Sequence, residues 1–145
     1  GTMGFGLPTA IGAALADPEA TVVCFTGDGS LLMNIQELAT VAELSLPIKI
    51  VLFDNACLGL VRQQQQLFYQ RRYFAAHYAQ PSDFVAIARA FGIHAVDIEP
   101  TVDTAMIRSA LSRPGPVLIR VPIEQHHNVS PMVGPGAANI EAIDC

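Results

Sequence analysis

The residues best suited to chemistry in this 145-residue chain are Gly27-Asp28-Gly29-Ser30, which directly follow the apolar run 21–26. That run is β-branched and aromatic and has the length of a buried strand. An acidic residue between two glycines at the end of a strand is poorly suited to a core. It suits a metal-bound phosphate, because the glycines let backbone N–H groups approach the anion and the carboxylate supplies a hard oxygen ligand.

A second polar pair, Asp54-Asn55, ends another apolar run at residues 48–53, and residues 31–44 between the two runs have helical periodicity. A strand–helix–strand crossover of about 30 residues sets two parallel strands side by side. We therefore expect Asp28 and Asn55 to meet at the carboxyl edge of a sheet, where open α/β folds bind ligands. Two oxygen ligands, diphosphate oxygens and water make the octahedral set that magnesium prefers. The N-terminus of the helix would direct its N–H groups and positive dipole end to the same place.

Similar alternation continues along the chain and predicts an α/β fold, with a parallel sheet between helical layers in a three-layer α/β/α arrangement. The expected helices are residues 8–16, residues 83–90 capped by Ser82 or Asp83, and a helix from Thr101 or Asp103 to residue 112. The expected strands are residues 93–98 and 117–121. We interpret residues 1–145 as one domain, a fragment of a longer chain, in which residues 123–145 form an extended tail rich in Gly, Pro and Asn.

Composition narrows the classes of partner. The net charge is −5 with no basic run, which argues against nucleic acid. Charged residues are only 14% of the chain against an average near 25%, so we expect part of the surface to be buried by a second domain or a subunit. No apolar stretch approaches the ~20 residues of a membrane span and no signal peptide pattern opens the chain. Three widely spread cysteines fit a reducing cytoplasm.

Several blocks of sequence resemble one family. Gly-Asp-Gly followed by Asn at this spacing is similar to the thiamin diphosphate motif of the pyruvate-utilising enzymes. The chain also carries Gly-Thr-Met-Gly-Phe-Gly-Leu-Pro at 1–8, Leu-Gly-Leu-Val-Arg-Gln at 58–63 and Pro-Met-Val-Gly-Pro-Gly-Ala-Ala-Asn at 131–139. Together they resemble the C-terminal cofactor domain of the acetolactate synthase (acetohydroxyacid synthase) catalytic subunit over nearly the whole chain, with the isozyme I type as the nearest form.

The resemblance implies thiamin diphosphate and Mg²⁺ as cofactors. It assigns magnesium to the side chains of Asp28 and Asn55 and to the main-chain carbonyl of Cys57. It further implies that the glycine-rich loop near Met3 supports the aminopyrimidine ring and that several amides meet the diphosphate. The implied cofactor-binding set is Gly1, Met3, Gly27, Asp28, Gly29, Ser30, Met33, Asn55, Cys57, Gly59 and Leu60.

Two of these positions have an alternative explanation, and a neighbour of Asn55 has a separate one. By resemblance, Met33 is the apolar wedge that holds the cofactor bent, while ordinary core packing is the alternative. A nucleophilic Cys57 is a second alternative, although no His stands near it in the sequence. Asp54 is better suited to capping the turn than to binding metal.

The resemblance also bears on substrate. Gln64 stands where much of the family has a tryptophan that favours 2-ketobutyrate over pyruvate as the second substrate, so the resemblance implies only a slight preference for the larger acceptor. Residues 67–82 are interpreted as a lid-like segment near the active site, and we expect residues 58–80 to be poorly ordered without thiamin diphosphate and magnesium.

The implied reaction condenses two pyruvates to 2-acetolactate with loss of CO₂, or pyruvate with 2-ketobutyrate, in isoleucine and valine biosynthesis. No Glu here matches the family's activating glutamate, which we expect on a missing N-terminal domain of a neighbouring subunit, so no catalytic residue is assigned in this chain. FAD, a homodimer and a small regulatory subunit are expected of the whole enzyme. The alternatives are another thiamin-dependent 2-keto acid decarboxylase or oxidase, or a non-catalytic cofactor-binding module.

Overall fold

The computed structural model describes residues 2–98 and 104–144. The chain divides into two compact units. The sheet unit comprises Gly1–Asp54 and Ser82–Pro122, and the α4 unit comprises Asn55–Pro81 and Ile123–Cys145.

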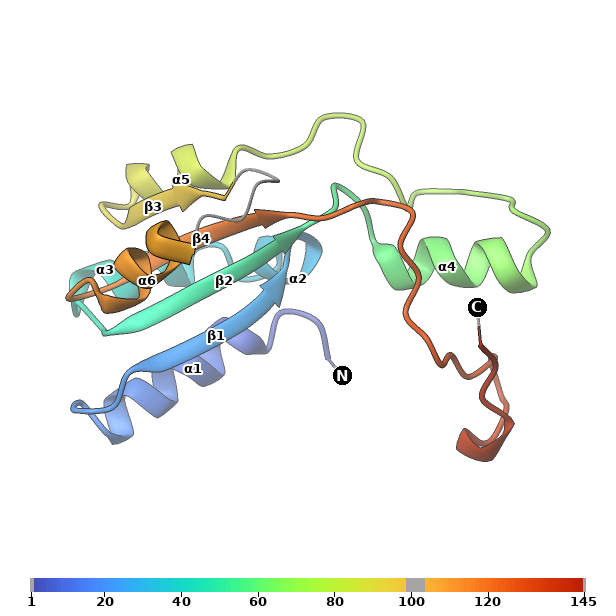
Figure 1. Cartoon of the computed structure of the whole chain (residues 1–145), viewed down its shortest axis with the longest axis horizontal. Helices are drawn as coiled ribbons and strands as arrows, with labels where there is room; N and C mark the ends of the chain where they lie inside the picture. The colour runs from blue at the N-terminus through green and yellow to red at the C-terminus, as the bar shows by residue number, and fades with distance from the viewer. Residues whose placement is uncertain (1, 99–103, 145) are drawn as a thin grey trace. The chain divides into compact units, whose positions relative to one another are not determined.

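The sheet unit is built on four parallel strands in the order β1-β2-β4-β3 (Figure 1). These are β1 (Val22–Gly27), β2 (Ile48–Asp54), β3 (His94–Asp97) and β4 (Val117–Pro122). Val22 pairs with Ile48 and Gly27 with Phe53, so β1 and β2 run level along their length. Because all four strands are parallel, their carboxyl ends meet at one edge of the sheet. The predicted parallel α/β sheet is therefore confirmed.

Helices cover both faces of this sheet, as the three-layer prediction required. One face packs against α1 (Gly6–Ala16), α2 (Asp28–Leu32), α3 (Glu37–Glu43) and α5 (Phe84–Ala90). The other packs against α6 (Thr104–Ser112). Side chains alternate between the two faces along each strand. Leu52 and Leu118 lie in the core beneath α1, α2, α3 and α5, called the first core. Val51 and Ile119 lie on the α6 side, in the second core.

The helix predicted over residues 31–44 forms differently. The structure has two helices there, because α2 already begins at Asp28 and a turn at residues 33–36 separates it from α3. Asp28 is thus the first residue of a helix of 5 residues. A helix this short has little macrodipole, so the dipole argument for anion binding is weaker than the sequence suggested.

The other helix boundaries follow from capping. Asp83 accepts a hydrogen bond from the Ala86 amide at 2.9 Å and begins α5, as predicted. Gly92, with φ +82°, follows its end, a conformation in which glycine carries no steric cost. The predicted start of α6 at Thr101 or Asp103 lies outside the described residues.

The α4 unit contains a helix that the sequence did not reveal, α4 (Gly59–Phe68). The Gln63 amide donates to the Val129 carbonyl at 2.7 Å and accepts from the Val129 N–H at 2.9 Å. The Arg62 guanidinium donates to the Asn128 side chain at 2.5 Å. These bonds tie residues 123–145, which include the short 3₁₀ helix η1 (Asn139–Glu141), to α4. The predicted disorder of residues 58–80 without cofactor stays a prediction.

A buried lysine joins the amino end of β2 to the turn after α6. The Lys49 ammonium, on a residue 2% exposed, donates to the carbonyls of Arg113 at 2.5 Å and Gly115 at 2.6 Å. Burial, with the charge of Arg113, lowers the pKa of Lys49, while these two hydrogen bonds favour the charged form.

Replacing Lys49 with methionine is expected to lower the free energy of unfolding by about 2 kcal/mol, because the carbonyls of Arg113 and Gly115 both lose their donor. Urea denaturation of the protein measures this. Arg108→Met, which removes an exposed cation of α6, is the matched control and should change stability by less than about 0.5 kcal/mol. Equal effects of the two substitutions would contradict the assigned role of Lys49.

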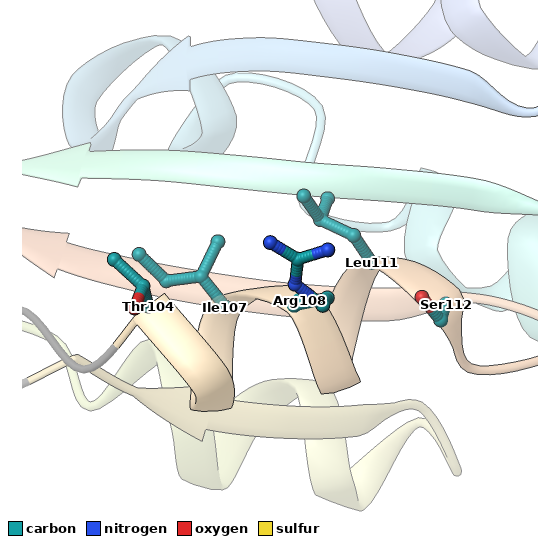
Figure 2. Close-up of a pocket in the computed structure, with 5 residues that line it drawn as sticks. All are labelled: Thr104, Ile107, Arg108, Leu111 and Ser112. Carbon is teal, nitrogen blue, oxygen red and sulfur yellow. The ribbon is translucent and has the colours of Figure 1, made fainter.

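The sheet face on the α6 side is only partly covered by the described helices. Figure 2 shows Ile107 and Leu111 of α6 reaching toward the strands beside Arg108. Next to them an apolar hollow of about 340 Å³ is lined by residues that include Val23, Phe25 and Val51. The rings of Phe25 and Phe53 stack there at 6.1 Å, with Phe25 66% exposed. The expectation that a domain or subunit buries part of this surface stays a prediction.

Candidate functional site

The end of β1 presents a buried carboxylate. Asp28 is 3% exposed, and its Oδ1 accepts the N–H of Gly29 at 2.7 Å. Because Gly27 pairs with Phe53, Asp28 and Asp54 are the next residues along two neighbouring strands. The main-chain atoms of both aspartates therefore lie at the same edge of the sheet. This is the edge where parallel α/β sheets bind ligands.

The glycine-rich loop at residues 2–5 is held against this segment from two sides. The N–H of Gly4 donates to Ser30 Oγ at 2.9 Å, and the Asn34 side-chain amide donates to the Gly4 carbonyl. The structure thus links the predicted loop around Met3 to Gly-Asp-Gly-Ser. Sequence reasoning missed Asn34, since a single amide in a helical pattern carries no signal. Gly1, also predicted to bind cofactor, lies outside the described residues.

Gly4→Ala is expected to disrupt the two hydrogen bonds that hold the glycine-rich loop. Gly4 has φ +79°, and a Cβ atom built on it would lie 2.7 Å from Asn34 Nδ2 and 3.0 Å from Met33 Cβ. Strain and displacement together should cost about 2 kcal/mol of stability, measured by thermal unfolding. Gly12→Ala is the control, because nothing lies within 4 Å of a Cβ there and alanine favours helix by about 1 kcal/mol. If Gly4→Ala were as stable as the wild type, the hydrogen bonds of Gly4 would make no contribution to stability.

Met33 does not pack in the core. Its side chain is 56% exposed, whereas Leu31 and Leu38 of the same segment are buried. Core packing, the alternative explanation for this methionine, therefore has no support in the structure. Its predicted role as a wedge against the cofactor stays a prediction.

Asp54 forms an ion pair that the sequence did not suggest. The Arg120 guanidinium donates from Nε to Asp54 Oδ2 at 2.7 Å, and from Nη1 to both Asp97 oxygens at 3.1 and 2.9 Å. Burial acts to lower the pKa of Arg120, but the hydrogen bonds and charges of Asp54 and Asp97 outweigh it and raise the pKa above its ordinary value. Arg120 is therefore a fixed cation between the carboxylates that end β2 and β3.

The α4 unit holds the other predicted ligands in one turn. The Cys57 N–H donates to Asn55 Oδ1 at 3.2 Å. A Cβ atom on Gly59 would lie 2.9 Å from Asn55 Nδ2, so a larger residue at the start of α4 would displace the Asn55 amide. Leu60 and Gln64 lie on the exposed surface of α4. The structure thus places Asn55, Cys57 and Gly59 in one turn. Their role as cofactor ligands stays a prediction.

Cys57 has a histidine closer than the sequence indicated. Its backbone forms an isolated antiparallel bridge with His77. The thiol is nevertheless poorly placed for nucleophilic chemistry, because Cys57 is 2% exposed. Cys24 is buried as well, and burial raises the pKa of its thiol.

We expect Cys24 and Cys57 to resist alkylation in the native protein, since a reactive thiol needs exposure and a lowered pKa. Brief iodoacetamide treatment followed by peptide mass spectrometry should label both cysteines only after unfolding in denaturant. Rapid native labelling of Cys57 would revive the nucleophile hypothesis.

The donor chemistry suits magnesium bound together with a phosphate ligand. Among residues 2–98 and 104–144, no group of three His, Cys, Asp or Glu side chains is arranged to hold a metal ion. Magnesium does not need such a cage, because it binds through one or two carboxylates, substrate phosphates and water. Within the sheet unit, the buried Asp28 carboxylate is a hard oxygen ligand of that kind.

Comparison with known proteins identifies the family. Residues 1–121 match the thiamine pyrophosphate enzyme, C-terminal TPP binding domain. The chain belongs to this family. Thiamine pyrophosphate (TPP) is another name for thiamin diphosphate, so the family match confirms the cofactor class inferred from the Gly-Asp-Gly motif.

Relatives of this TPP-binding domain are acetolactate synthases. The chain is 54% and 51% identical to the large subunits of acetolactate synthase isozymes 1 and 2 of Escherichia coli K12. It is 43% identical to the acetolactate synthase large subunit of Pyropia yezoensis. Each comparison covers 99% of this chain but only 25–26% of the relative, so the chain spans about a quarter of their length. In the described part of this TPP-binding domain, no helix is both long and apolar enough to span a membrane.

Proposed function

We propose that this chain is the magnesium- and diphosphate-anchoring domain of an acetolactate synthase. The whole protein would condense two pyruvates to 2-acetolactate with loss of CO₂, or pyruvate with 2-ketobutyrate. The observation that carries the proposal is the register of β1 with β2, which brings Gly27-Asp28 and Phe53-Asp54 to one edge of the sheet. The similarity to acetolactate synthase large subunits supports the choice of reaction.

In this proposal the anchoring residues have separate tasks. Asp28, Asn55 and the Cys57 carbonyl hold Mg²⁺, and Gly27 lets the chain pass close to the diphosphate. The amides that meet the diphosphate are those of Gly29, Ser30, Gly59 and Leu60. When bound, thiamin diphosphate supplies the electron sink for decarboxylation of a 2-keto acid.

The remaining residues of the proposed site act on the organic part of the cofactor. Gly1 and Met3 support the aminopyrimidine ring through the loop that Ser30 and Asn34 hold in place. The exposed Met33 side chain would pack against bound thiamin diphosphate and hold its bent conformation. Gln64 faces the acceptor substrate, where it allows pyruvate and 2-ketobutyrate to compete without strong preference.

Other requirements of the reaction lie outside this chain in the proposal. The activating glutamate comes from the N-terminal domain of a partner subunit in a homodimer, and FAD binds elsewhere in the whole protein. A small regulatory subunit and a cytoplasmic role in isoleucine and valine biosynthesis belong to the same hypothesis.

Calorimetric titration of the full protein with thiamin diphosphate tests the anchor. Binding should be strong in excess MgCl₂ and at least tenfold weaker with EDTA. Incubation of the loaded protein with pyruvate, followed by mass spectrometry, should then reveal acetolactate. Binding that is indifferent to the metal would contradict the magnesium assignment.

The products distinguish the alternatives. Acetaldehyde from pyruvate indicates a decarboxylase, and consumption of O₂ with acetate formation indicates an oxidase. Metal-dependent binding with no turnover, even after addition of a candidate N-terminal domain, indicates a non-catalytic cofactor-binding module.

A further inference from the structure

The ion pairs of Arg120 join three neighbouring strands near their carboxyl ends. Asp54 is the last residue of β2, Asp97 is the last residue of β3, and Arg120 lies on β4 between them. Side chains alternate along a strand, so all three lie on the face that carries Leu52, Ala95 and Leu118 in the first core. This is also the face against which α2, the helix that begins at Asp28, packs through Leu31.

The two carboxylates depend on Arg120 to different degrees. Asp54 is 4% exposed, whereas the side chain of Asp97 is 47% exposed. Water can solvate the charge of Asp97, but a buried carboxylate needs a paired cation and is screened little by salt. The 2.7 Å contact between Arg120 Nε and Asp54 Oδ2 supplies that cation.

The buried carboxylate lies beside the proposed anchor. The pairing of Gly27 with Phe53 places Asp28 and Asp54 next along adjacent strands, and Asn55 follows Asp54 in the chain. Without a cation, Asp54 would repel a diphosphate by its charge. It would also offer Mg²⁺ a second hard oxygen ligand in competition with Asp28.

We propose that Arg120 is a positioning residue for the cofactor anchor. Its guanidinium holds the Asp54 carboxylate and neutralises its charge. Asp28, and not Asp54, is then the carboxylate that binds the metal. This inference rests on the proposed function. Arg120 acts through Asp54 and is assigned no contact with the cofactor.

Two double variants of the full protein test this role, because they have the same net charge. Arg120→Met with Asp97→Asn leaves the buried Asp54 carboxylate without its cation. Arg120→Met with Asp54→Asn removes that carboxylate and leaves the exposed Asp97. Calorimetry measures the affinity for thiamin diphosphate at fixed MgCl₂, and thermal unfolding is recorded for each protein.

The first double variant should bind thiamin diphosphate at least tenfold more weakly than the wild type, with a higher MgCl₂ requirement. The second should bind within threefold of the wild type, as should the single variant Asp54→Asn. Equal affinities of the two double variants would overturn the role of Arg120. If the arginine were purely structural, its loss would weaken binding equally in both variants. If the first double variant does not fold, Arg120→Lys replaces it and should bind more weakly than Arg120→Lys with Asp54→Asn; equality again overturns the role.

The wild-type titration separates this inference from the proposed function. A wild type that does not bind thiamin diphosphate in a magnesium-dependent way refutes the anchor itself. A wild type that does bind, with no rescue by Asp54→Asn in the Arg120→Met background, refutes only the role of Arg120.

Discussion

Asp28→Ala is expected to abolish magnesium-dependent binding of thiamin diphosphate while the protein stays folded. Asp28 is the only carboxylate in the proposed ligand set, and the electrostatic attraction of a cation to a neutral amide and a carbonyl is much weaker. We expect the affinity to fall at least 100-fold, about 2.8 kcal/mol. Stability should change by about 1 kcal/mol, which is the usual contribution of a hydrogen bond such as the one that Asp28 accepts from the Gly29 N–H.

Calorimetry in excess MgCl₂ measures the affinity of this variant, and urea denaturation measures its stability. Asp17→Ala is the matched control, since Asp17 is an exposed aspartate that precedes β1 at the amino edge of the sheet. Asp17→Ala should bind the cofactor like the wild type. Unchanged affinity in Asp28→Ala would remove Asp28 from the metal site, and loss of folding in that variant would show that the buried carboxylate is structural.

Met33→Ala should lower turnover sharply and leave the fold intact. If the side chain holds the cofactor bent, its loss should reduce kcat by roughly 10- to 100-fold, or about 1.4–2.7 kcal/mol in the barrier. Because the residue is 56% exposed, the free energy of unfolding should change by less than about 0.5 kcal/mol. The affinity for the diphosphate anchor should fall only slightly.

Steady-state acetolactate formation by the full protein, measured at saturating cofactor, gives the turnover of this variant. Leu32→Ala, the neighbouring exposed leucine at the end of α2, is the control and should keep wild-type kcat. Full turnover in Met33→Ala would show that the methionine has no part in shaping the cofactor.

The sheet was predictable because its strands are unbroken apolar runs. Residues 48–53, for example, were expected as a strand, and β2 spans Ile48–Asp54. Parallel pairing then followed from the helical spacing between runs. The edge at which Asp28 lies was predictable for the same reason, since the direction of a parallel strand fixes which end carries the ligand.

Long-range side-chain partners could not be predicted. Arg120 meets Asp54 across 66 residues of sequence, and Gln63 meets Val129 across the same separation. Neither pair leaves a local pattern, because only the folded topology brings them together. The break between α2 and α3 was missed as well. Residues 31–44 keep the apolar periodicity of a helix across the turn, so only the hydrogen bonding of the folded chain reveals the break. Helix α4 was missed because it has few apolar residues and four consecutive glutamines separate them.

The central claim is that Asp28 and Asn55 share one divalent cation with a diphosphate. A crystal structure of the full protein grown with thiamin diphosphate and Mn²⁺ in place of Mg²⁺ tests it most directly, because anomalous scattering locates the metal. We expect one anomalous peak bonded to Asp28, to the Asn55 side-chain oxygen and to the Cys57 carbonyl, at roughly the 2.1 Å of a magnesium site. A metal-bound diphosphate seated away from Asp28, or held without Asn55, would contradict it.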